Sequence, residues 1–115
     1  MELVCRVLGT VRVLVVQGRI DHASAAGFQQ GLVPYLDACK AQGSPLVLDF
    51  GGVDYVSSIG LRALMLAAKQ VKAQGGKIAI AALTPIVLEV FQISRFNLVF
   101  NVFNTAEAAA AELSK

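Results

Sequence analysis

The chain has 115 residues, which is the length of one domain, and we expect residues 1–115 to form a single domain. Hydrophobic residues make up 56% of the chain and charged residues only 16%, which excludes a disordered protein and predicts a large core. The net charge of +2 arises from scattered basic residues, whereas nucleic-acid binding needs a concentrated basic face, so we expect no nucleic-acid partner.

The sequence shows no membrane segment and no secretory signal. Its most apolar stretch, residues 78–93, contains Thr84-Pro85, Glu89 and Gln92, and it is too short to cross a bilayer. The first residues lack the basic segment and long apolar run of a signal peptide. We therefore expect a cytoplasmic protein with no direct membrane insertion.

The residues that most often bind metals are few. Cys5 and Cys39 have no spacing typical of a zinc site, and we interpret them as two small buried hydrophobic residues. His22 is the only histidine, so a histidine-based metal site is not expected. The sequence thus predicts neither a metal nor a cofactor.

The chain opens with two predicted strands, at residues 3–8 and 11–17, joined by a tight turn at Gly9-Thr10. The second strand does not alternate apolar and polar residues cleanly, which is typical of a central strand buried on both faces. Gly18 is expected to end it.

A helix is predicted next, over residues 22–41, with Asp21 as its N-cap and Gly43 as its stop. Apolar residues recur at three- and four-residue steps and form one stripe toward the core. Pro34 lies inside this pattern, so we expect it to kink or split the helix. The stripe consists of Ala25, Phe28, Leu32, Leu36 and Cys39.

The remaining chain alternates short apolar strands with amphipathic helices, and a loop is expected at residues 51–54. Thr84 followed by Pro85 is a typical helix start, and Gly75-Gly76 a typical helix end. The predicted strands cover residues 46–50, 77–83 and 98–103, and the predicted helices cover residues 61–74, 85–93 and 105–113.

The resulting order, β-β-α-β-α-β-α-β-α, predicts an α/β fold. Its central sheet should be mostly parallel with right-handed crossovers, and the opening hairpin should give it an antiparallel N-terminal edge strand. In such sheets, functional sites lie where the carboxyl ends of strands meet the starts of helices. Here those positions are residues 18–21, 51–58 and 83–84.

Ser57 and Ser58 stand at one of these junctions, and four roles are open to them. A nucleophile elbow requires glycine two residues before and after the serine, but Val56 occupies the first position, and His22 would have to be the base. A phosphate-cradling loop requires a Gly-Lys-Ser/Thr run, which is absent. The third role is a simple helix cap, which accounts for one serine but not for two.

The fourth role is a regulatory phosphorylation site. If Ser57 is the N-cap, Ser58 is the first helical residue and its hydroxyl faces outward. A phosphate there would carry a charge of about −1.5 to −2, and the helix dipole would tolerate it. A partner covering the loop would not tolerate it, so the modification would act on binding rather than on folding.

Four motifs resemble those of the STAS domain, in particular the short, single-domain bacterial anti-sigma factor antagonists (anti-anti-sigma factors). Gly75-Gly76 resembles the end of the family's next helix. The other three motifs are Gly18-Arg19-Ile20-Asp21, Leu46-Val47-Leu48-Asp49-Phe50 with the following Val53, Tyr55 and Val56, and Ser57-Ser58-Ile59-Gly60-Leu61. The resemblance covers nearly the whole chain and implies the STAS fold.

This resemblance implies roles for individual residues. The family's phosphorylated serine falls on Ser58, with Ser57 as the alternative acceptor. Ser57 stands where many members have aspartate, and Ile59 stands where the family usually has a small residue. Asp21 matches an acidic position near the site and is expected to hold the Ser58 hydroxyl or to orient its own loop, while Gly60 supports the helix start. The implied partner surface comprises Asp21, His22, Val53, Asp54, Tyr55, Val56, Ser57, Ser58, Ile59 and Arg62.

The function implied by the resemblance is partner switching by a binding module that is not an enzyme. The unphosphorylated form would bind an anti-sigma factor that is also a serine/threonine kinase of the histidine-kinase ATPase fold, and the sigma factor would be released. Phosphorylation of Ser58 would abolish binding, and a PP2C-type phosphatase would reverse it. The alternative is a STAS accessory subunit of a transporter, for example a lipid-transport ATPase, without a phospho-switch.

Overall fold

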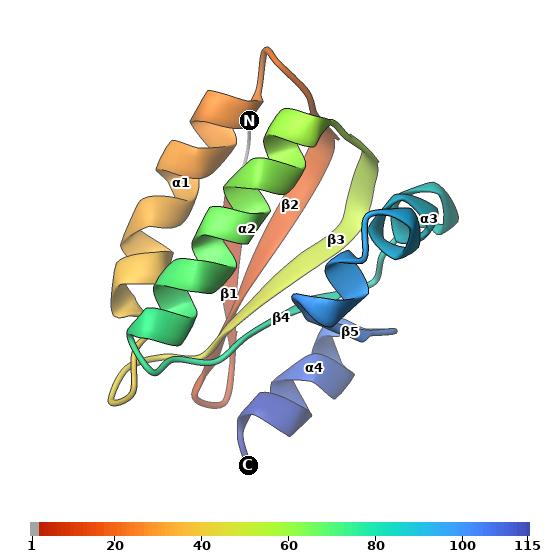
Figure 1. Ribbon diagram of the computed structural model, residues 1–115. Coiled ribbons are helices and arrows are strands. Elements are labelled where there is room, and N and C mark those ends of the chain that lie inside the picture. Colours follow the sequence, from red (N-terminus) through yellow and green to blue (C-terminus); the bar gives the residue numbers. More distant parts are fainter. Residues whose placement is uncertain (1–2) are drawn as a thin grey trace.

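The computed structural model describes residues 3–115 and contains one five-stranded sheet (Figure 1). The strands lie in the spatial order β1-β2-β3-β4-β5; β1 is antiparallel to β2, and the other pairs are parallel. The predicted fold class is confirmed. The strands are β1 (Leu3–Leu8), β2 (Val11–Ile20), β3 (Leu46–Val56), β4 (Ile78–Ala81) and β5 (Asn101–Phe103). The helices are α1 (Ala25–Ala38), α2 (Ser58–Ala73), α3 (Pro85–Ile93), α4 (Ala106–Leu113) and the short 3₁₀ helix η1 (Phe96–Leu98).

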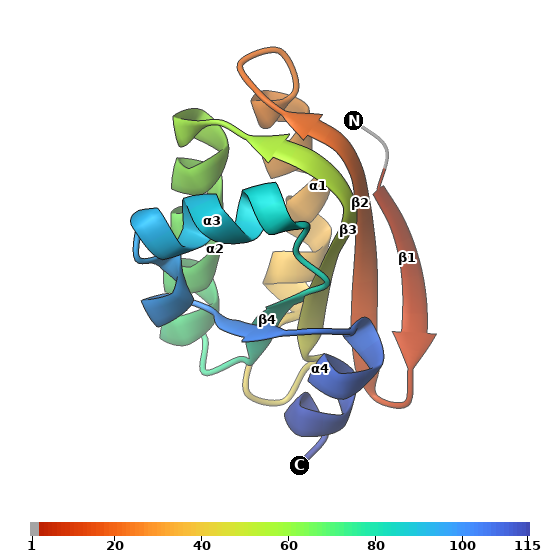
Figure 2. The same cartoon turned by 90° about the vertical axis from the view of Figure 1, so that its right-hand side faces the viewer.

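Two hydrophobic cores lie on the two faces of the sheet. The larger core packs α1, α2 and α3 against one face, and α1 and α2 lie side by side there (Figure 1). The smaller core packs α4 against the lower part of the other face (Figure 2). Since α4 reaches only part of that face, the carboxyl ends of β2 and β3 project beyond it.

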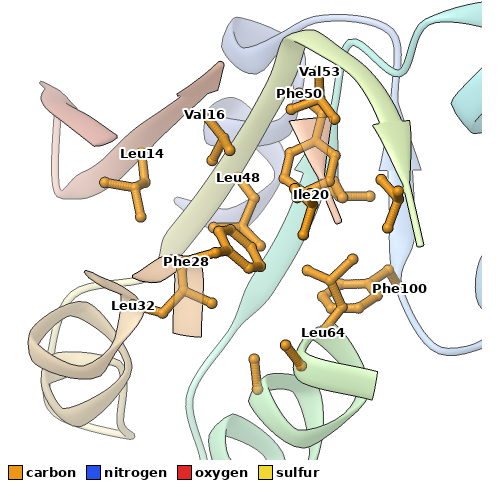
Figure 3. Packing of buried hydrophobic residues seen from close by; sticks show 14 of the residues in the cluster. Leu14, Val16, Ile20, Phe28, Leu32, Leu48, Phe50, Val53, Leu64 and Phe100 are labelled. Atoms are coloured by element: carbon orange, nitrogen blue, oxygen red, sulfur yellow. The ribbon is translucent and has the colours of Figure 1, made fainter. Parts of the chain in front are cut away.

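Phe50 lies at the centre of the larger core and is fully buried. Its ring meets that of Phe28 edge to face, with the centroids 6.3 Å apart, an arrangement favoured by the charge distribution of aromatic rings. Ile20, Val53 and Leu64 surround the same region (Figure 3). This packing fixes the ends of β2 and β3 against α1 and α2.

Both central strands are longer than predicted. β2 continues through Gly18, which has a φ of +101°, as far as Ile20, and β3 includes the residues expected to form a loop, 51–54. The register between the two strands shifts twice, between Val15 and Gln17 and again between Gly18 and Arg19. These irregularities let pairing continue past residues that break the apolar pattern.

The first helix is shorter than predicted. It begins at Ala25 after Ser24, so Asp21 is not its N-cap, and it ends at Ala38, well before Gly43. Pro34 does not split it. Burial of Phe28, Leu32 and Leu36 holds the two halves on the sheet as one helix although Pro34 donates no hydrogen bond.

Three element boundaries and one cysteine also differ from the predictions. α2 begins at Ser58 rather than at residue 61, β4 stops at Ala81 before Ala82 adopts a φ of +62°, and the predicted last strand is shortened by η1. Cys5 is exposed on the edge strand β1, contrary to the prediction that it is buried. Cys39 is buried, and burial raises the pKa of its thiol.

Residues 3–115 contain no helix with the length and hydropathy needed to cross a bilayer. Within the same residues, no three histidine, cysteine, aspartate or glutamate side chains come together in a way that would hold a metal ion.

Candidate functional site

The carboxyl ends of β2 and β3 and the start of α2 meet at one corner of the molecule. Ile20 pairs with Val56 in the last step of the parallel ladder, and the Ser57 N–H donates a hydrogen bond of 2.7 Å to the Ile20 carbonyl. This pairing brings the loop after β2, which contains Asp21, beside the serine pair. The sequence placed both segments at strand ends, and the fold puts them next to each other.

The two serine hydroxyls have different environments. Ser57 is buried, and its Oγ accepts a hydrogen bond of 3.2 Å from the Gly60 N–H, so Ser57 is the N-cap of α2. Ser58 is the first residue of α2 and is exposed. Within residues 3–115, no side chain or backbone group hydrogen-bonds to the Ser58 hydroxyl. One hydroxyl is therefore engaged in the fold, and the other faces solvent.

Asp21 shapes its own loop rather than contacting Ser58. Its Oδ1 accepts hydrogen bonds from the backbone N–H groups of Ala23, at 3.0 Å, and Ser24, at 3.1 Å. The Ser24 backbone N–H is the main cause of a lowered Asp21 pKa, with smaller contributions from the Ser24 hydroxyl, the Ala23 N–H and the Arg19 guanidinium. Of the two expected roles for Asp21, the hydrogen bonds correspond to loop orientation.

Arg19 links the end of β3 to the loop after β2. It lies in the junction predicted at residues 18–21, but no role was predicted for its own side chain. Its guanidinium lies 4.4 Å from the centre of the Tyr55 ring and 3.8 Å from Asp21 Oδ2. The link arises because Arg19 and Tyr55 are paired neighbours in β2 and β3. The sequence did not reveal the Arg19–Tyr55 contact, because β2 was predicted to end before Arg19.

The residues predicted to contact a partner fall into two groups. The exposed group at this corner is His22, Asp54, Tyr55, Ser58, Ile59 and Arg62, with Asp21 partly exposed. The side chains of Val53 and Val56 belong to the larger core, which corrects the prediction that they lie on the partner surface. Ser57 is likewise buried, because it lies between the end of β3 and the first turn of α2, where its side chain caps the helix.

Two features of a nucleophile elbow are absent around Ser58 in residues 3–115, namely a hydrogen-bonded base and a glycine turn. His22, the one available imidazole, makes no hydrogen bond to the Ser58 hydroxyl within the described chain. Val56 is part of β3 and does not form the tight glycine turn that presents a nucleophile. The geometry therefore offers an accessible hydroxyl at a helix start, without the base and the glycine turn that a nucleophile elbow requires.

Gly60 lets the first turn of α2 pack closely against β2. A Cβ atom at this position would lie 2.6 Å from Cγ2 of Ile20 and 3.0 Å from Cγ1 of Val56, both buried. We expect Gly60→Ala to lower the free energy of unfolding by about 1–2 kcal/mol, because overpacking outweighs the helix propensity of alanine. Urea denaturation measures the change.

Gly31→Ala in α1 is the matched control for Gly60→Ala. The added methyl group would meet only the end of the Leu3 side chain, which is partly exposed and can turn away. We expect Gly31→Ala to be neutral or to stabilise the protein by up to about 1 kcal/mol. Equal effects of the two substitutions would show that Gly60 has no special packing role.

Comparison with known proteins gives concordant sequence and structure matches. The STAS domain family matches residues 2–109. A curated protein of Bordetella bronchiseptica, named "Putative anti-sigma factor antagonist BtrV", is 37% identical over 111 residues, which cover 96% of this chain and 93% of the relative.

Two solved structures have a similar fold. An anti-sigma factor antagonist from Mycobacterium paratuberculosis is 19% identical with a TM-score of 0.87, and the match covers 99% of this chain and 94% of the other. The Bacillus cell fate determinant SpoIIAA, solved in its phosphorylated form, is 15% identical with a TM-score of 0.69, and the match covers 96% and 98% of the two chains.

Proposed function

Because the chain belongs to the STAS domain family, we propose that it is an anti-sigma factor antagonist whose binding is controlled by phosphorylation of Ser58. The relative that carries the antagonist name is matched along nearly its whole length, which supports the same role for this chain. In this role the chain is a cytoplasmic binding module without catalytic activity of its own.

The observation that carries the phospho-switch is the contrast between Ser57 and Ser58. Ser58 is exposed at the first position of α2, and its hydroxyl has no hydrogen-bond partner in the described part of the chain. Unpaired N–H groups and the helix dipole stabilise an anion at this position. A phosphate on Ser58 would therefore leave the fold intact and change only the charge that a partner meets.

Phosphorylation of the alternative acceptor, Ser57, would have a different effect. Its hydroxyl oxygen caps α2, and the residue is buried between the end of β3 and the helix. A kinase could reach it only after the first turn of α2 had opened. We therefore assign the phosphate to Ser58.

The proposed partners follow from this chemistry. An anti-sigma factor that is also a serine/threonine kinase of the histidine-kinase ATPase fold binds the unphosphorylated corner, and it supplies ATP and Mg²⁺. Phosphorylation separates the complex, and a PP2C-type phosphatase restores the binding form. The exposed side chains of His22, Asp54, Tyr55, Ile59 and Arg62 surround Ser58 as the contact surface.

The transporter alternative has weaker support. It requires no phosphorylated serine, so it leaves the exposed Ser58 beside the capped Ser57 without a function. The relative matched over 93% of its length is named as an antagonist rather than as a transporter subunit.

The test is phosphorylation of the purified chain by the candidate kinase with ATP and Mg²⁺, followed by phosphosite mapping. We expect one phosphate on Ser58, which is lost in Ser58→Ala and kept in Ser57→Ala. A phosphate on Ser57 alone would move the switch to the buried hydroxyl, and a phosphate on neither serine would overturn the phospho-switch.

A further inference from the structure

The exposed side of α2 carries a regular row of residues that begins at Ser58. The steps along this row are four, three, four and three residues, the spacing at which side chains of one helix face the same neighbour. The row consists of four exposed residues, Ser58, Arg62, Lys69 and Lys72, and of Met65, which is partly buried against the larger core. The proposed phosphorylation site is thus the first residue of a stripe that runs down the helix.

A groove follows this stripe between α2 and the segment that contains η1. Its upper part is a hollow of about 640 Å³ that begins at Ser58 and is lined by Ile59, Leu66 and Phe96. A second hollow, lined by Leu98 and Val99, continues it toward the end of α2. Since Met65 and Lys69 line both hollows, they form one continuous surface, which we call the α2 groove.

Large apolar side chains are exposed along the α2 groove. Ile59 is 40% exposed, Leu66 44% and Leu98 77%, and Val99 is exposed beside them. Exposed apolar side chains that cluster around a hollow indicate a binding surface, whereas single ones do not. Ile59, which departs from the small residue usual at its position, forms the apolar edge of the groove beside Ser58.

The charged residues of the α2 groove are mainly basic. Arg62, Lys69 and Lys72 are exposed, and within residues 3–115 none of them forms an ion pair. The acidic residue in the lining is Glu112, whose carboxylate already pairs with Lys115 at 3.0 Å. An occupant of this groove should therefore combine apolar and acidic side chains.

We propose that the α2 groove docks an acidic amphipathic helix of the anti-sigma factor, an inference that rests on the proposed function. Its apolar side chains would cover Ile59, Leu66 and Leu98, and its carboxylates would pair with the basic residues of the stripe. From Ser58 to Lys72 the helix rises about 21 Å, which matches about four turns of a partner helix.

This arrangement links the groove to the switch. Ser58 stands at the head of the groove, so its phosphate would face the acidic helix directly. Like charges at such a contact oppose binding, and the phosphate would also compete for Arg62, one turn further along α2. Binding in the basic groove is thus sensitive to phosphorylation, because the groove that attracts the acidic helix begins at the phosphorylated residue.

The first test uses the anti-sigma factor that binds the wild-type chain and no longer binds Ser58→Asp. We expect Leu66→Asn to lower its affinity about tenfold, as for an apolar anchor in an interface. Val33→Asn is the matched control, because Val33 is a similarly exposed apolar residue (48%) on α1, away from the groove. Calorimetric titration measures both affinities.

The second test reverses charge in the groove. We expect Lys69→Glu to lower the affinity about tenfold and to reduce its dependence on salt, whereas Lys40→Glu, outside the groove, leaves both unchanged. The side chains of Leu66, Val33, Lys69 and Lys40 are all exposed, so we expect each variant to fold. Circular dichroism and urea denaturation check this.

The outcomes separate this inference from the function on which it rests. If no anti-sigma factor binds the wild-type chain, the proposed function fails. Suppose that an anti-sigma factor binds the wild-type chain but not Ser58→Asp, and that it binds Leu66→Asn and Lys69→Glu as tightly as wild type. The proposed function then stands, and the groove inference is overturned. If Leu66→Asn abolishes self-association without changing partner affinity, the groove belongs to a second copy, and the inference is also overturned.

Discussion

Ser58→Asp is expected to lower the affinity for the anti-sigma factor at least about 100-fold while leaving the fold intact. The substitution places a carboxylate on the exposed first residue of α2, where the helix dipole favours it. The same charge would lie inside the contact with the partner, where it is desolvated and opposes an acidic surface. Calorimetric titration and urea denaturation of the same preparation separate binding from stability.

Two variants serve as controls for Ser58→Asp. Ser58→Ala removes the acceptor without adding charge and should bind like wild type but resist the kinase. Ser94→Asp adds the same charge at another exposed serine, at the end of α3, and should leave affinity unchanged. If Ser58→Asp binds as tightly as Ser58→Ala, charge at this position does not control the partner.

Phe50→Ala is expected to lower the free energy of unfolding by about 3–5 kcal/mol, because it removes a large buried ring and leaves a cavity. Phe50 is fully buried, and the substitution also removes its edge-to-face contact with Phe28. A loss of this size is a large fraction of the stability of an average domain, about 5–15 kcal/mol. Urea denaturation followed by circular dichroism measures the change.

Phe103→Ala is the matched control for Phe50→Ala. Phe103 is only partly buried, at the margin of the smaller core. Truncation of its side chain therefore removes less buried apolar surface than truncation of Phe50. We expect a loss of roughly half that of Phe50→Ala or less. Equal losses from the two substitutions would contradict the central position of Phe50 in the core.

Local sequence patterns were sufficient to predict the element order and the sheet. The spacing of apolar residues identified the strands and helices. Because strands and helices alternate after an opening hairpin, the order predicted a mostly parallel sheet with one antiparallel edge strand. Ser57 and Ser58 were also placed at a junction between a strand and a helix from the sequence alone. Each of these inferences depends on interactions between residues that are close in the chain.

Several boundaries did not follow from local patterns. Pro34 was expected to kink or split the first helix, and the split is wrong, because packing against the sheet holds Ala25–Ala38 as one helix. β3 was expected to end at residue 50, but pairing with β2 carries it to Val56. In both cases a contact with a distant segment outweighed the preference of the local sequence.

The sequence by itself determined the fold class, the family resemblance and the serine pair, because these depend on composition, on periodicity and on motifs of adjacent residues. Only the tertiary structure decided which side chains are exposed around the serine pair. Val53 and Val56 pack in the larger core, and the Arg19 guanidinium lies over the Tyr55 ring. Phe96 of η1 packs beside α2 and lines the α2 groove with it. These features arise where segments far apart in the chain meet, and the free energy of packing, rather than local preference, sets their geometry.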